Sequence, residues 1–407
     1  MNGDLTLPRI PVSTYRLHFN SRFTFSDAAD IVPYLDELGI SDIYASPCFA
    51  AGKGTIVGYD VVDPTKLNPE IGTEKTYDRL VGELRKHRMG QILDIVPNHM
   101  YVESAENAWW QDVLENGPSS PCAAFFDIDW NPVERKLEDK VLIPILGEQY
   151  GTVLERQELK IVFEKGAFFL RYFDHKLPIL PETYVDILRH RIDKLEAALP
   201  YSDHPDLAEL LSVITALDCL PSYKEREEAR LAERSREKEI IKKRLYQLYG
   251  ESRPIRAFVN ENIAIFNGRA EEPPSFDRLD DLLSKQVWRL SYWRVATEEI
   301  NYRRFFDING LAAIRVENPV VFQKTHALIL RLVRENRVQG LRVDHPDGLY
   351  NPVEYFRRLQ RECFLQFRLS LGESTKKGGS AGADGADRES EILSEYAEIV
   401  ASNPEFK

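Results

Sequence analysis

Arg342 and Asp344 are the residues of this chain whose types and spacing could support covalent chemistry. They lie two apart in the run Gly340-Leu-Arg-Val-Asp-His-Pro-Asp-Gly348, whose apolar residues predict a short strand between two amphipathic helices. Residues two apart on a strand face the same side, and a guanidinium beside a carboxylate favours its charged form and orients it. An oriented carboxylate at the end of a parallel strand could act as a nucleophile, whereas the alternative is a structural ion pair.

Polar loops after three predicted strands offer further side chains for such a site. They contribute Tyr59 and Asp60 from the second loop, Asp94, Asn98 and His99 from the third, and His345 and Asp347 from the fourth. Because the C-terminal ends of neighbouring parallel strands meet at one edge, these side chains should converge. Each also has a local explanation, as a turn aspartate, a core carboxylate or an ordinary loop histidine, and the convergence favours a site. The spacing of calcium-binding loops is missing, so we predict no metal and no cofactor.

Strand and helix patterns alternate along the chain and predict a parallel α/β fold. The predicted strands cover 11–19, 43–47, 91–96 and 338–343. One predicted helix begins near Ser26, and three others cover 73–87, 319–336 and 352–363. Ser26 is expected to cap the first helix. The apolar face of the helix at 319–336 is expected to include Val320, Leu328, Leu332 and Val333.

About 240 residues separate the third and fourth predicted strands, which is far more than a normal connection. We therefore expect an insertion in this place. The stretch 159–173 shows a hairpin pattern. The charge-rich stretch 225–249 is expected to be a solvated, salt-bridged helix, and 370–390 a flexible surface loop. The predicted division is 1–104 for the first three strands, 105–183 for a mixed insertion, 184–302 for an insertion that is helical throughout, and 303–407 for the fourth strand and its helices.

Composition excludes several kinds of partner. The net charge of −12 disfavours nucleic acid and anionic membranes. The four cysteines form no CxxC motif, which fits a reducing compartment. The N-terminus has no signal-peptide pattern and no apolar run could span a bilayer, so we expect a cytoplasmic protein. The oligomeric state is left open by the sequence.

Short motifs in these loops resemble the signatures of the α-amylase clan of retaining glycosidases and transglycosylases. The motifs are Asp94-Ile-Val-Pro-Asn98-His99, Gly340-Leu-Arg342-Val-Asp344 and Gly58-Tyr59-Asp60. The resemblance implies a (β/α)8 TIM barrel of the α-amylase type, of which about the first four β/α units would be present. It also implies that Asp344 is the nucleophile, that Arg342 orients it, and that His99 and Tyr59 bind the sugar in subsite −1.

Longer stretches resemble one family of this clan, the maltooligosyltrehalose synthases. They are residues 11–17, 60–72, 288–309 and 340–349, with departures at Val57, where relatives often carry His, and at Gly310, where Asp is common. The resemblance implies an isomerase that converts the reducing-end α-1,4 linkage of maltooligosaccharides into an α,α-1,1 linkage. Further substrate-binding candidates are Asp60, Asp94, Asn98, His345, Asp347, Arg303, Arg304 and Asp307. Most aromatic residues between 288 and 306 are expected to pack in a core.

The clan's general acid, a glutamate after the fifth strand, has no counterpart among the four predicted strands. Glu391, Glu395 and Glu398 lie on a polar helix and are not expected to replace it. We therefore expect an N-terminal portion of such an enzyme that is inactive by itself. The alternatives are an α-glucan hydrolase or 4-α-glucanotransferase of the same clan, and a non-catalytic sugar-binding fragment.

Overall fold

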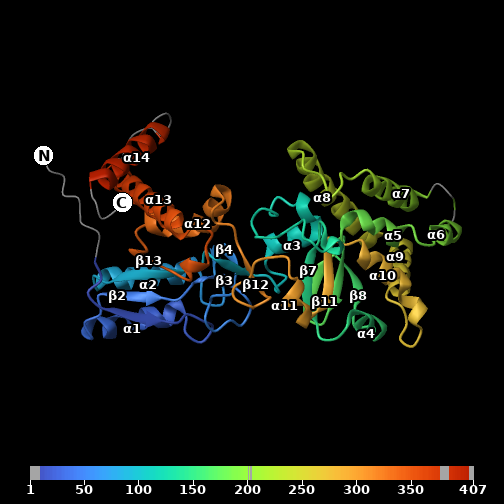
Figure 1. Cartoon of the computed structure of the whole chain (residues 1–407), viewed down its shortest axis with the longest axis horizontal. Coiled ribbons are helices and arrows are strands. Elements are labelled where there is room, and N and C mark those ends of the chain that lie inside the picture. The colour runs from blue at the N-terminus through green and yellow to red at the C-terminus, as the bar shows by residue number, and fades with distance from the viewer. Residues whose placement is uncertain (1–9, 200, 202–203, 376–384, 403–407) are drawn as a thin grey trace. The chain divides into compact units, whose positions relative to one another are not determined.

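The computed structural model describes residues 10–199, 201, 204–375 and 385–402, and the chain forms two compact units (Figure 1). Unit 1 consists of the residues up to Tyr101 and those from Ile314 onward. Unit 2 consists of Val102–Ala313 and interrupts unit 1 along the chain. The finer division of the insertion at 183 and 302 stays a prediction.

Unit 1 is built around a parallel sheet of four strands in the order β1-β2-β5-β13. The strands are β1 (Thr14–Leu17), β2 (Asp42–Ala45), β5 (Gly90–Ile95) and β13 (Gly340–Val343). On the two central strands, Ile43, Leu93 and Ile95 are completely buried, as in a sheet that is covered on both faces. The predicted α/β class is confirmed, and no closed barrel occurs among the described residues of either unit.

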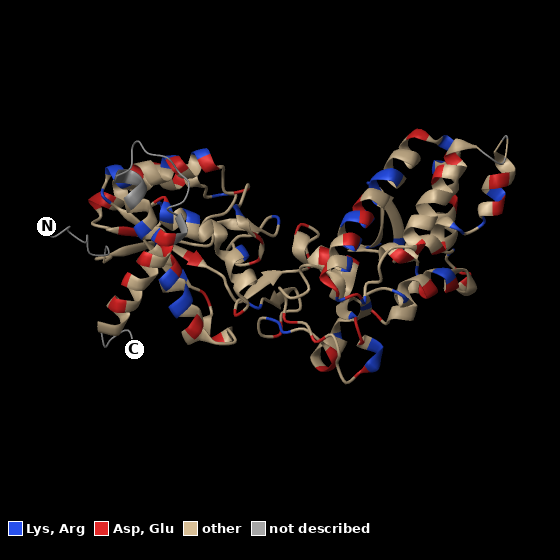
Figure 2. Cartoon of the chain, turned by 90° about the horizontal axis from the view of Figure 1, so that it is seen from above, with Lys and Arg blue, Asp and Glu red and all other residues tan. Residues whose placement is uncertain are grey.

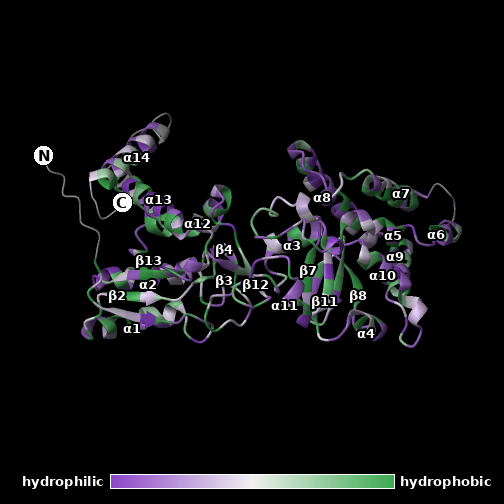
Figure 3. Ribbon diagram, in the orientation of Figure 1, coloured by the Kyte–Doolittle hydropathy of each residue, from purple (hydrophilic) through white to green (hydrophobic). Residues whose placement is uncertain are grey.

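Helices follow the strands of unit 1 and cover its sheet. They are α1 (Phe25–Glu37), α2 (Glu74–Lys86), α12 (Pro319–Arg334) and α13 (Pro352–Thr375). Helix α1 packs against α2, and α12 packs against α13. Figure 3 shows green, apolar residues interspersed with purple, polar residues along these helices, as expected when each helix buries one face.

Two details of these helices differ from the sequence predictions. Thr24, not Ser26, caps α1, because the Thr24 side chain and the Asp27 side chain each accept the other residue's backbone N–H. Val320 is 53% exposed in the first turn of α12, so the apolar face of this helix starts at the buried Val321.

The C-terminal helices are longer than predicted. Helix α13 continues to Thr375, so residues 370–375 are helical and do not form a loop. Residues 376–384 of that predicted loop lie outside the described residues. Helix α14 (Gly385–Ser402) includes the predicted last helix, and Arg368 of α13 pairs with Glu395 of α14 at 2.8 Å.

Short strands shape the loop that follows β2. They are β3 (Phe49–Ala51) and β4 (Val61–Leu67), which pair antiparallel. A further short strand, β6 (His99–Tyr101), lies in a different loop, the one after β5. Gly58 lies in the loop between β3 and β4 with a φ of 79°, and a Cβ there would lie 2.6 Å from the Pro47 carbonyl oxygen. Only glycine fits such a position, and it sets the direction of the neighbouring Tyr59.

His326 is a buried titratable group between α12 and α13. Its Nε2 lies 2.9 Å from the Tyr355 hydroxyl, and its ring stacks on Phe322 with centroids 4.0 Å apart. Burial lowers the pKa of His326 from 6.5 to about 4. Between these two values the unfolded chain binds a proton that the folded chain does not bind, so stability is lost as the pH falls from about 6.5 to about 4.

Replacing His326 with glutamine should therefore flatten the acid side of the stability profile. The wild-type chain should lose about 2–3 kcal/mol through this one group across the window, and the variant should not. Urea unfolding at pH 7 and pH 5 measures the difference. Ser46→Ala is the matched control, because it removes a buried hydroxyl of unit 1 that accepts the Phe19 N–H but no titratable group. An equally steep profile in both variants would contradict the prediction.

Unit 2 contains two small sheets. Strands β8 (Lys160–Glu164), β9 (Ala167–Tyr172) and β10 (His175–Pro178) pair antiparallel, which confirms the predicted hairpin. Strand β7 (Val141–Leu146) pairs parallel with β11 (Trp288–Tyr292). The prediction that 184–302 is helical throughout is wrong at β11, because this strand is formed by pairing with a segment distant in sequence.

Helices make up most of the rest of unit 2. They are α3 (Ala108–Asn116), α4 (Tyr150–Glu155), α5 (Tyr184–Leu188), α6 (Ile192–Ala198), α7 (Pro205–Asp218), α8 (Glu228–Glu251), α9 (Arg253–Phe266), α10 (Asp277–Ser284) and α11 (Ala296–Glu299), and the unit ends in β12 (Leu311–Ala313). Figure 2 shows acidic and basic residues interspersed along the helices. Over the described residues, no helix combines the length and apolarity needed to cross a membrane.

Helix α8 is less solvated than its charge-rich sequence predicts. Arg234 is only 1% exposed and pairs with Glu182 at 2.9 Å. Lys238 is 6% exposed and pairs with Glu115 of α3 at 2.7 Å. Buried charges of this kind need fixed partners, so one face of α8 is bound into unit 2 by ion pairs.

Candidate active site

Asp344 and Arg342 form the centre of the candidate site in unit 1. Arg342 lies on β13, and its Nη1 donates to Asp344 Oδ1 over 2.5 Å. The Asp344 backbone N–H donates to Ile95 O at 2.9 Å, which ties this residue to β5. The Asp344 side chain is 16% exposed, so its carboxylate is held in one place and can still be reached. A positioned and accessible carboxylate is what nucleophilic attack requires.

Asp94 is a second carboxylate of the site and is completely buried on β5. It lies opposite Arg342 in the parallel register, and Arg342 Nη1 donates to its two oxygens at 2.9 and 3.2 Å. Asp94 Oδ2 also accepts hydrogen bonds from Tyr59 Oη at 2.6 Å, Tyr44 Oη at 2.9 Å and Arg16 Nη1 at 3.1 Å. Since a buried carboxylate is stable only with such partners, Asp94 is an anchor for its neighbours.

The network shifts the pKa values of its members. Partial burial acts to lower the pKa of Arg342, but the hydrogen bonds to Asp94 and Asp344 outweigh it, so that pKa is raised. For Tyr59, burial and then the hydrogen bond to Asp94 raise the pKa to about 12. Near neutral pH, Arg342 is therefore a cation and Tyr59 a protonated phenol.

His99 lies on β6, just beyond the end of β5, and is 1% exposed. Burial lowers its pKa to about 4; a backbone hydrogen bond with Tyr59 opposes this shift, and the charge of His345 adds to it. The His99 Nδ1 lies 3.3 Å from Asn98 Nδ2. The imidazole is thus neutral near pH 7, so one ring nitrogen can donate a hydrogen bond to a sugar hydroxyl or the other can accept one from it.

A close approach between Gly348 and Asn98 shapes the loop after β13. A Cβ at Gly348 would lie 2.7 Å from Asn98 Oδ1, so a larger residue would displace this side chain. In the same loop, His345 has a left-handed backbone with a φ of 47°, and its Nδ1 lies 3.1 Å from Asp347 Oδ1. These contacts place Asn98, His345 and Asp347 beside the ends of β5 and β13.

Asp60 holds the loop that carries Tyr59. Its Oδ1 accepts the Thr55 hydroxyl at 2.5 Å, and its backbone oxygen accepts the Gly52 N–H at 2.9 Å. A Cβ at Gly52 would lie 2.7 Å from Asp60 Oδ2, so the carboxylate packs directly on the glycine. Asp60 therefore has a structural role here, and its part in substrate binding stays a prediction.

Three predicted site residues, Arg303, Arg304 and Asp307, belong to unit 2. Arg303 Nε donates to Asp127 Oδ2 at 2.8 Å in a groove that is lined by several carboxylates. Arg304 binds the Asn309 side chain, and Asp307 is exposed. Within this unit, the three residues form a charged stretch before β12.

The aromatic residues of unit 2 fall into two groups. Trp288 is 1% exposed and its Nε1 donates to Pro178 O at 2.9 Å, so it is a packing residue. Trp293 and Phe306 are 51% and 70% exposed, and the Arg294 guanidinium lies 5.2 Å from the Trp293 ring centroid. Among the aromatic residues from 288 to 306, Trp293 and Phe306 are therefore the ones with the most accessible rings.

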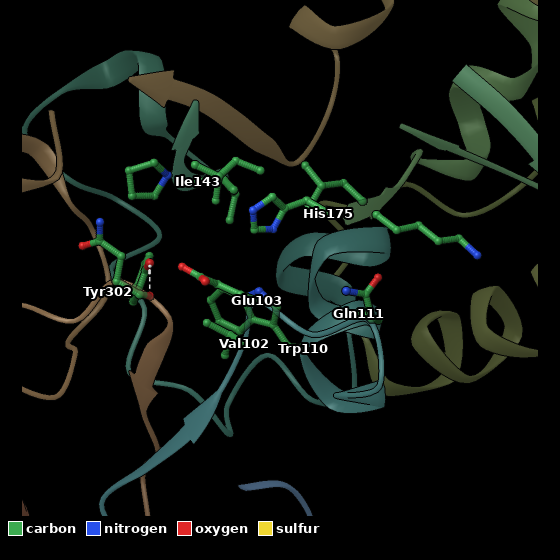
Figure 4. A pocket seen from close by; sticks show the side chains of 12 residues that line it. Val102, Glu103, Trp110, Gln111, Ile143, His175 and Tyr302 are labelled. Carbon is green, nitrogen blue, oxygen red and sulfur yellow. Dashed lines mark hydrogen bonds between the residues drawn. The ribbon is translucent and has the colours of Figure 1, made fainter. Parts of the chain in front are cut away.

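Unit 2 also has a narrow pocket that the sequence did not indicate. Figure 4 shows the side chains of Glu103 and His175 pointing into it between apolar walls. Tyr302 lines the pocket; burial raises its pKa, and its hydroxyl donates to Asn309 O at 2.8 Å. The contributing segments are distant in sequence, so no local pattern marks this pocket. Among all the described residues, this pocket included, no group of three or more His, Cys, Asp and Glu side chains is arranged to hold a metal ion.

Sequence reasoning missed Arg16 and Tyr44, which both contact Asp94. Arg16 lies on β1 and Tyr44 on β2, and the Arg16 guanidinium lies 4.0 Å from the Tyr44 ring centroid. The available signal was a polar residue within each of two predicted strands of a buried sheet.

Comparison with known proteins places the chain in a family. Residues 28–195 match the model of the α-amylase catalytic domain. Over 86% of its length, the chain is 31% identical to a Mycobacterium tuberculosis (strain H37Rv) protein that carries the name maltooligosyl trehalose synthase, of which the match covers 33%. An intracellular maltogenic amylase of Bacillus subtilis is 35% identical over 36% of this chain and 24% of its own.

Solved structures show the same relationship. The maltooligosyltrehalose synthase from Arthrobacter ramosus matches with a TM-score of 0.58 and 30% identity, over 87% of this chain and 33% of that one. For a hypothetical maltooligosyl trehalose synthase from Sulfolobus tokodaii the TM-score is 0.56 with 28% identity, over 87% and 34%. The chain thus spans about a third of the length of these relatives. The chain belongs to the α-amylase family, and over most of its length it is similar to maltooligosyltrehalose synthases.

Proposed function

We propose that this chain carries the nucleophile of an intramolecular transglycosylation on maltooligosaccharides. The reducing-end α-1,4 linkage is broken and the released glucose is rejoined through an α,α-1,1 linkage. The observation that carries the proposal is the Asp344 carboxylate, which Arg342 holds at 2.5 Å beside the buried Asp94. The similarity to maltooligosyltrehalose synthases over 86% of the chain supports this choice of reaction.

Asp344 acts in both steps of the proposed reaction. In the first step, one of its oxygens attacks C1 of the penultimate glucose, the bond from C1 to the leaving oxygen breaks, and a carboxylic acid protonates that oxygen. In the second step, the C1 hydroxyl of the released glucose gives its proton to the same acid, now a carboxylate, and its oxygen displaces Asp344 from C1. Arg342 orients Asp344 throughout.

The other carboxyl groups of the candidate site, those of Asp94, Asp347 and Asp60, are not placed to act as the proton donor. Asp94 is completely buried and its oxygens are occupied by hydrogen bonds. Asp347 pairs with His345, and Asp60 is bound within its own loop. The proton donor, which retaining enzymes place about 5–5.5 Å from the nucleophile, is therefore to be sought outside this set of residues.

Binding and shielding of the sugar are assigned to other side chains. The ring of Tyr59 offers a face for stacking, and the neutral His99 offers a hydrogen bond to a hydroxyl. An isomerisation also demands that water be kept from the glucosyl intermediate. In unit 2, the substrate-binding roles of Arg303, Arg304 and Asp307 stay predictions, and the aromatic side chains of Trp293 and Phe306 are exposed.

An activated glycosyl fluoride tests the nucleophile without a proton donor. With 5-fluoro-α-D-glucosyl fluoride, Asp344 should attack C1 while fluoride leaves with the bonding electron pair. Intact-protein mass spectrometry should then show one added fluoroglucosyl group on the 407-residue chain, and peptide mapping should find it on Asp344. The label should persist, because the ring fluorine disfavours the positive charge of the second transition state.

The outcomes separate the possible functions. A label on a different carboxylate would contradict the assignment of Asp344, and maltooligosaccharide binding without a label would indicate a sugar-binding protein. With α-maltosyl fluoride as donor and glucose as acceptor, an α,α-1,1-linked product supports the proposed reaction. An α-1,4-linked product would instead indicate a 4-α-glucanotransferase, and release of maltose alone a hydrolase.

A further inference from the structure

Arg16 connects three residues of the candidate site from the first strand of the sheet. Its Nη1 donates to Asp94 Oδ2 at 3.1 Å, and its Nη2 donates to Tyr59 Oη at 2.6 Å. Its guanidinium lies over the Tyr44 ring at 4.0 Å, and so reaches across β2 to β5. The third nitrogen of the guanidinium, Nε, donates to His18 Nε2 at 3.1 Å. All of these contacts lie within unit 1.

The charges of this cluster balance only when Arg16 is included. Two carboxylates, Asp94 and Asp344, share two guanidinium groups, those of Arg16 and Arg342. Asp94 is completely buried, whereas the Asp344 side chain is 16% exposed. A buried carboxylate loses more by losing a cation than one that water can reach, so the two would compete unequally for a single guanidinium.

We propose that Arg16 is a positioning residue: it shares the charge of Asp94, so that Arg342, which also bonds Asp94, keeps its contact with the nucleophile Asp344. This inference rests on the proposed function of Asp344. Without Arg16, Arg342 would shift toward Asp94, and the Asp344 carboxylate would lose the contact that fixes its direction. Arg16 acts through other residues and does not itself touch the reacting atoms.

The same contacts assign a role to the Tyr59 hydroxyl. Its proton is donated to Asp94 at 2.6 Å, and its oxygen accepts from Arg16 at 2.6 Å. With donor and acceptor both in use, the hydroxyl fixes the ring, and the ring face remains for the sugar. The guanidinium group of Arg16 therefore has two positioning roles. It fixes the ring of Tyr59 directly, and it fixes the nucleophile Asp344 through Asp94 and Arg342.

The inactivation kinetics of the chain with 5-fluoro-α-D-glucosyl fluoride test this proposal. Arg16→Gln should lower the rate constant of labelling at saturating reagent by at least about tenfold, because a displaced nucleophile reacts more slowly. Arg16→Lys keeps a cation near Asp94 but cannot form both planar contacts, so its rate should lie between those of the wild type and Arg16→Gln. Arg79→Gln is the matched control, since it removes a half-exposed arginine that pairs with Asp30 on the surface of unit 1.

Each result decides a separate point. Wild-type labelling rates in Arg16→Gln would overturn the proposal, as would an equal fall in Arg79→Gln. If Arg16→Gln does not fold, Arg16→Lys replaces it, and a wild-type rate constant in that variant overturns the proposal. A label that never forms on Asp344 in the wild-type chain refutes the proposed function, whereas a normal label that is insensitive to Arg16 refutes only the role of Arg16.

Discussion

Replacing Asp344 with asparagine should lower the rate of labelling by 5-fluoro-α-D-glucosyl fluoride by at least about 10³-fold. Asparagine has nearly the same volume as aspartate, but its amide carries no charge and is a poor nucleophile. Arg342 keeps its hydrogen bonds to Asp94 in this variant, so the sheet and the sugar-binding residues should stay in place. Isothermal titration with maltopentaose should accordingly give an affinity close to that of the wild-type chain.

Asp78→Asn provides the control for the Asp344 variant. Asp78 pairs with Arg337 at 2.6 Å, and its side chain is 55% exposed. Arg337 also contacts Glu74, so the loss of one surface partner should change neither folding nor labelling. A labelling rate in Asp344→Asn that matches this control would remove Asp344 from the reaction.

Maltopentaose should remain unconverted by the same chain that reacts with glycosyl fluorides. Its leaving oxygen needs a proton, and general acid help is worth roughly 10²–10⁴-fold. In unit 1, Asp94 accepts hydrogen bonds within the buried network, and the Asp347 carboxylate lies beside the His345 ring. Neither carboxyl group is therefore placed to supply that proton. Incubation followed by an assay for reducing ends measures the rate directly.

A loss of reducing ends with maltopentaose would contradict this expectation. It would mean that a carboxyl group elsewhere in the 407 residues protonates the leaving oxygen. Replacing the exposed carboxylates one at a time by their amides would then identify that group. The labelling of Asp344 by the fluoride serves as the internal control that the preparation is folded.

The strands of unit 1 and several of their polar residues could be predicted from the sequence, because apolar runs and helix periodicity are local signals. Arg342 and Asp344 could be found in this way, since Arg342 lies on a short apolar strand and Asp344 directly follows it. Arg16 could not be found in the same way. Its partner Asp94 lies on a strand that is not adjacent to β1, and only the strand order β1-β2-β5 brings the two together.

The errors in unit 2 have a similar cause. Trp288 to Tyr292 alternates between apolar and polar residues over five positions, but helical segments on both sides obscured this signal, and the strand pairs with β7 far away along the chain. In α8, the density of charge suggested a solvated helix, yet Arg234 and Lys238 are buried against acidic residues of other segments. In both cases contacts with distant segments decide the structure, and for the buried charges of α8 the local sequence carries no signal of them.

The interruption of unit 1 by unit 2 also bears on the order of folding. Within unit 1, the Ile314 N–H donates to Asn98 O at 3.0 Å, and within unit 2 the Val102 N–H donates to Gly310 O at 2.8 Å. Each bond holds the beginning and the end of the insertion close together. If unit 2 folds first, the long loop between β5 and β13 becomes a short connection. The entropic cost of bringing β13 to β5 then falls by about 2–3 kcal/mol. Arg342 and Asp344 would then reach Asp94 of β5 together and late in folding, after the inserted unit has formed.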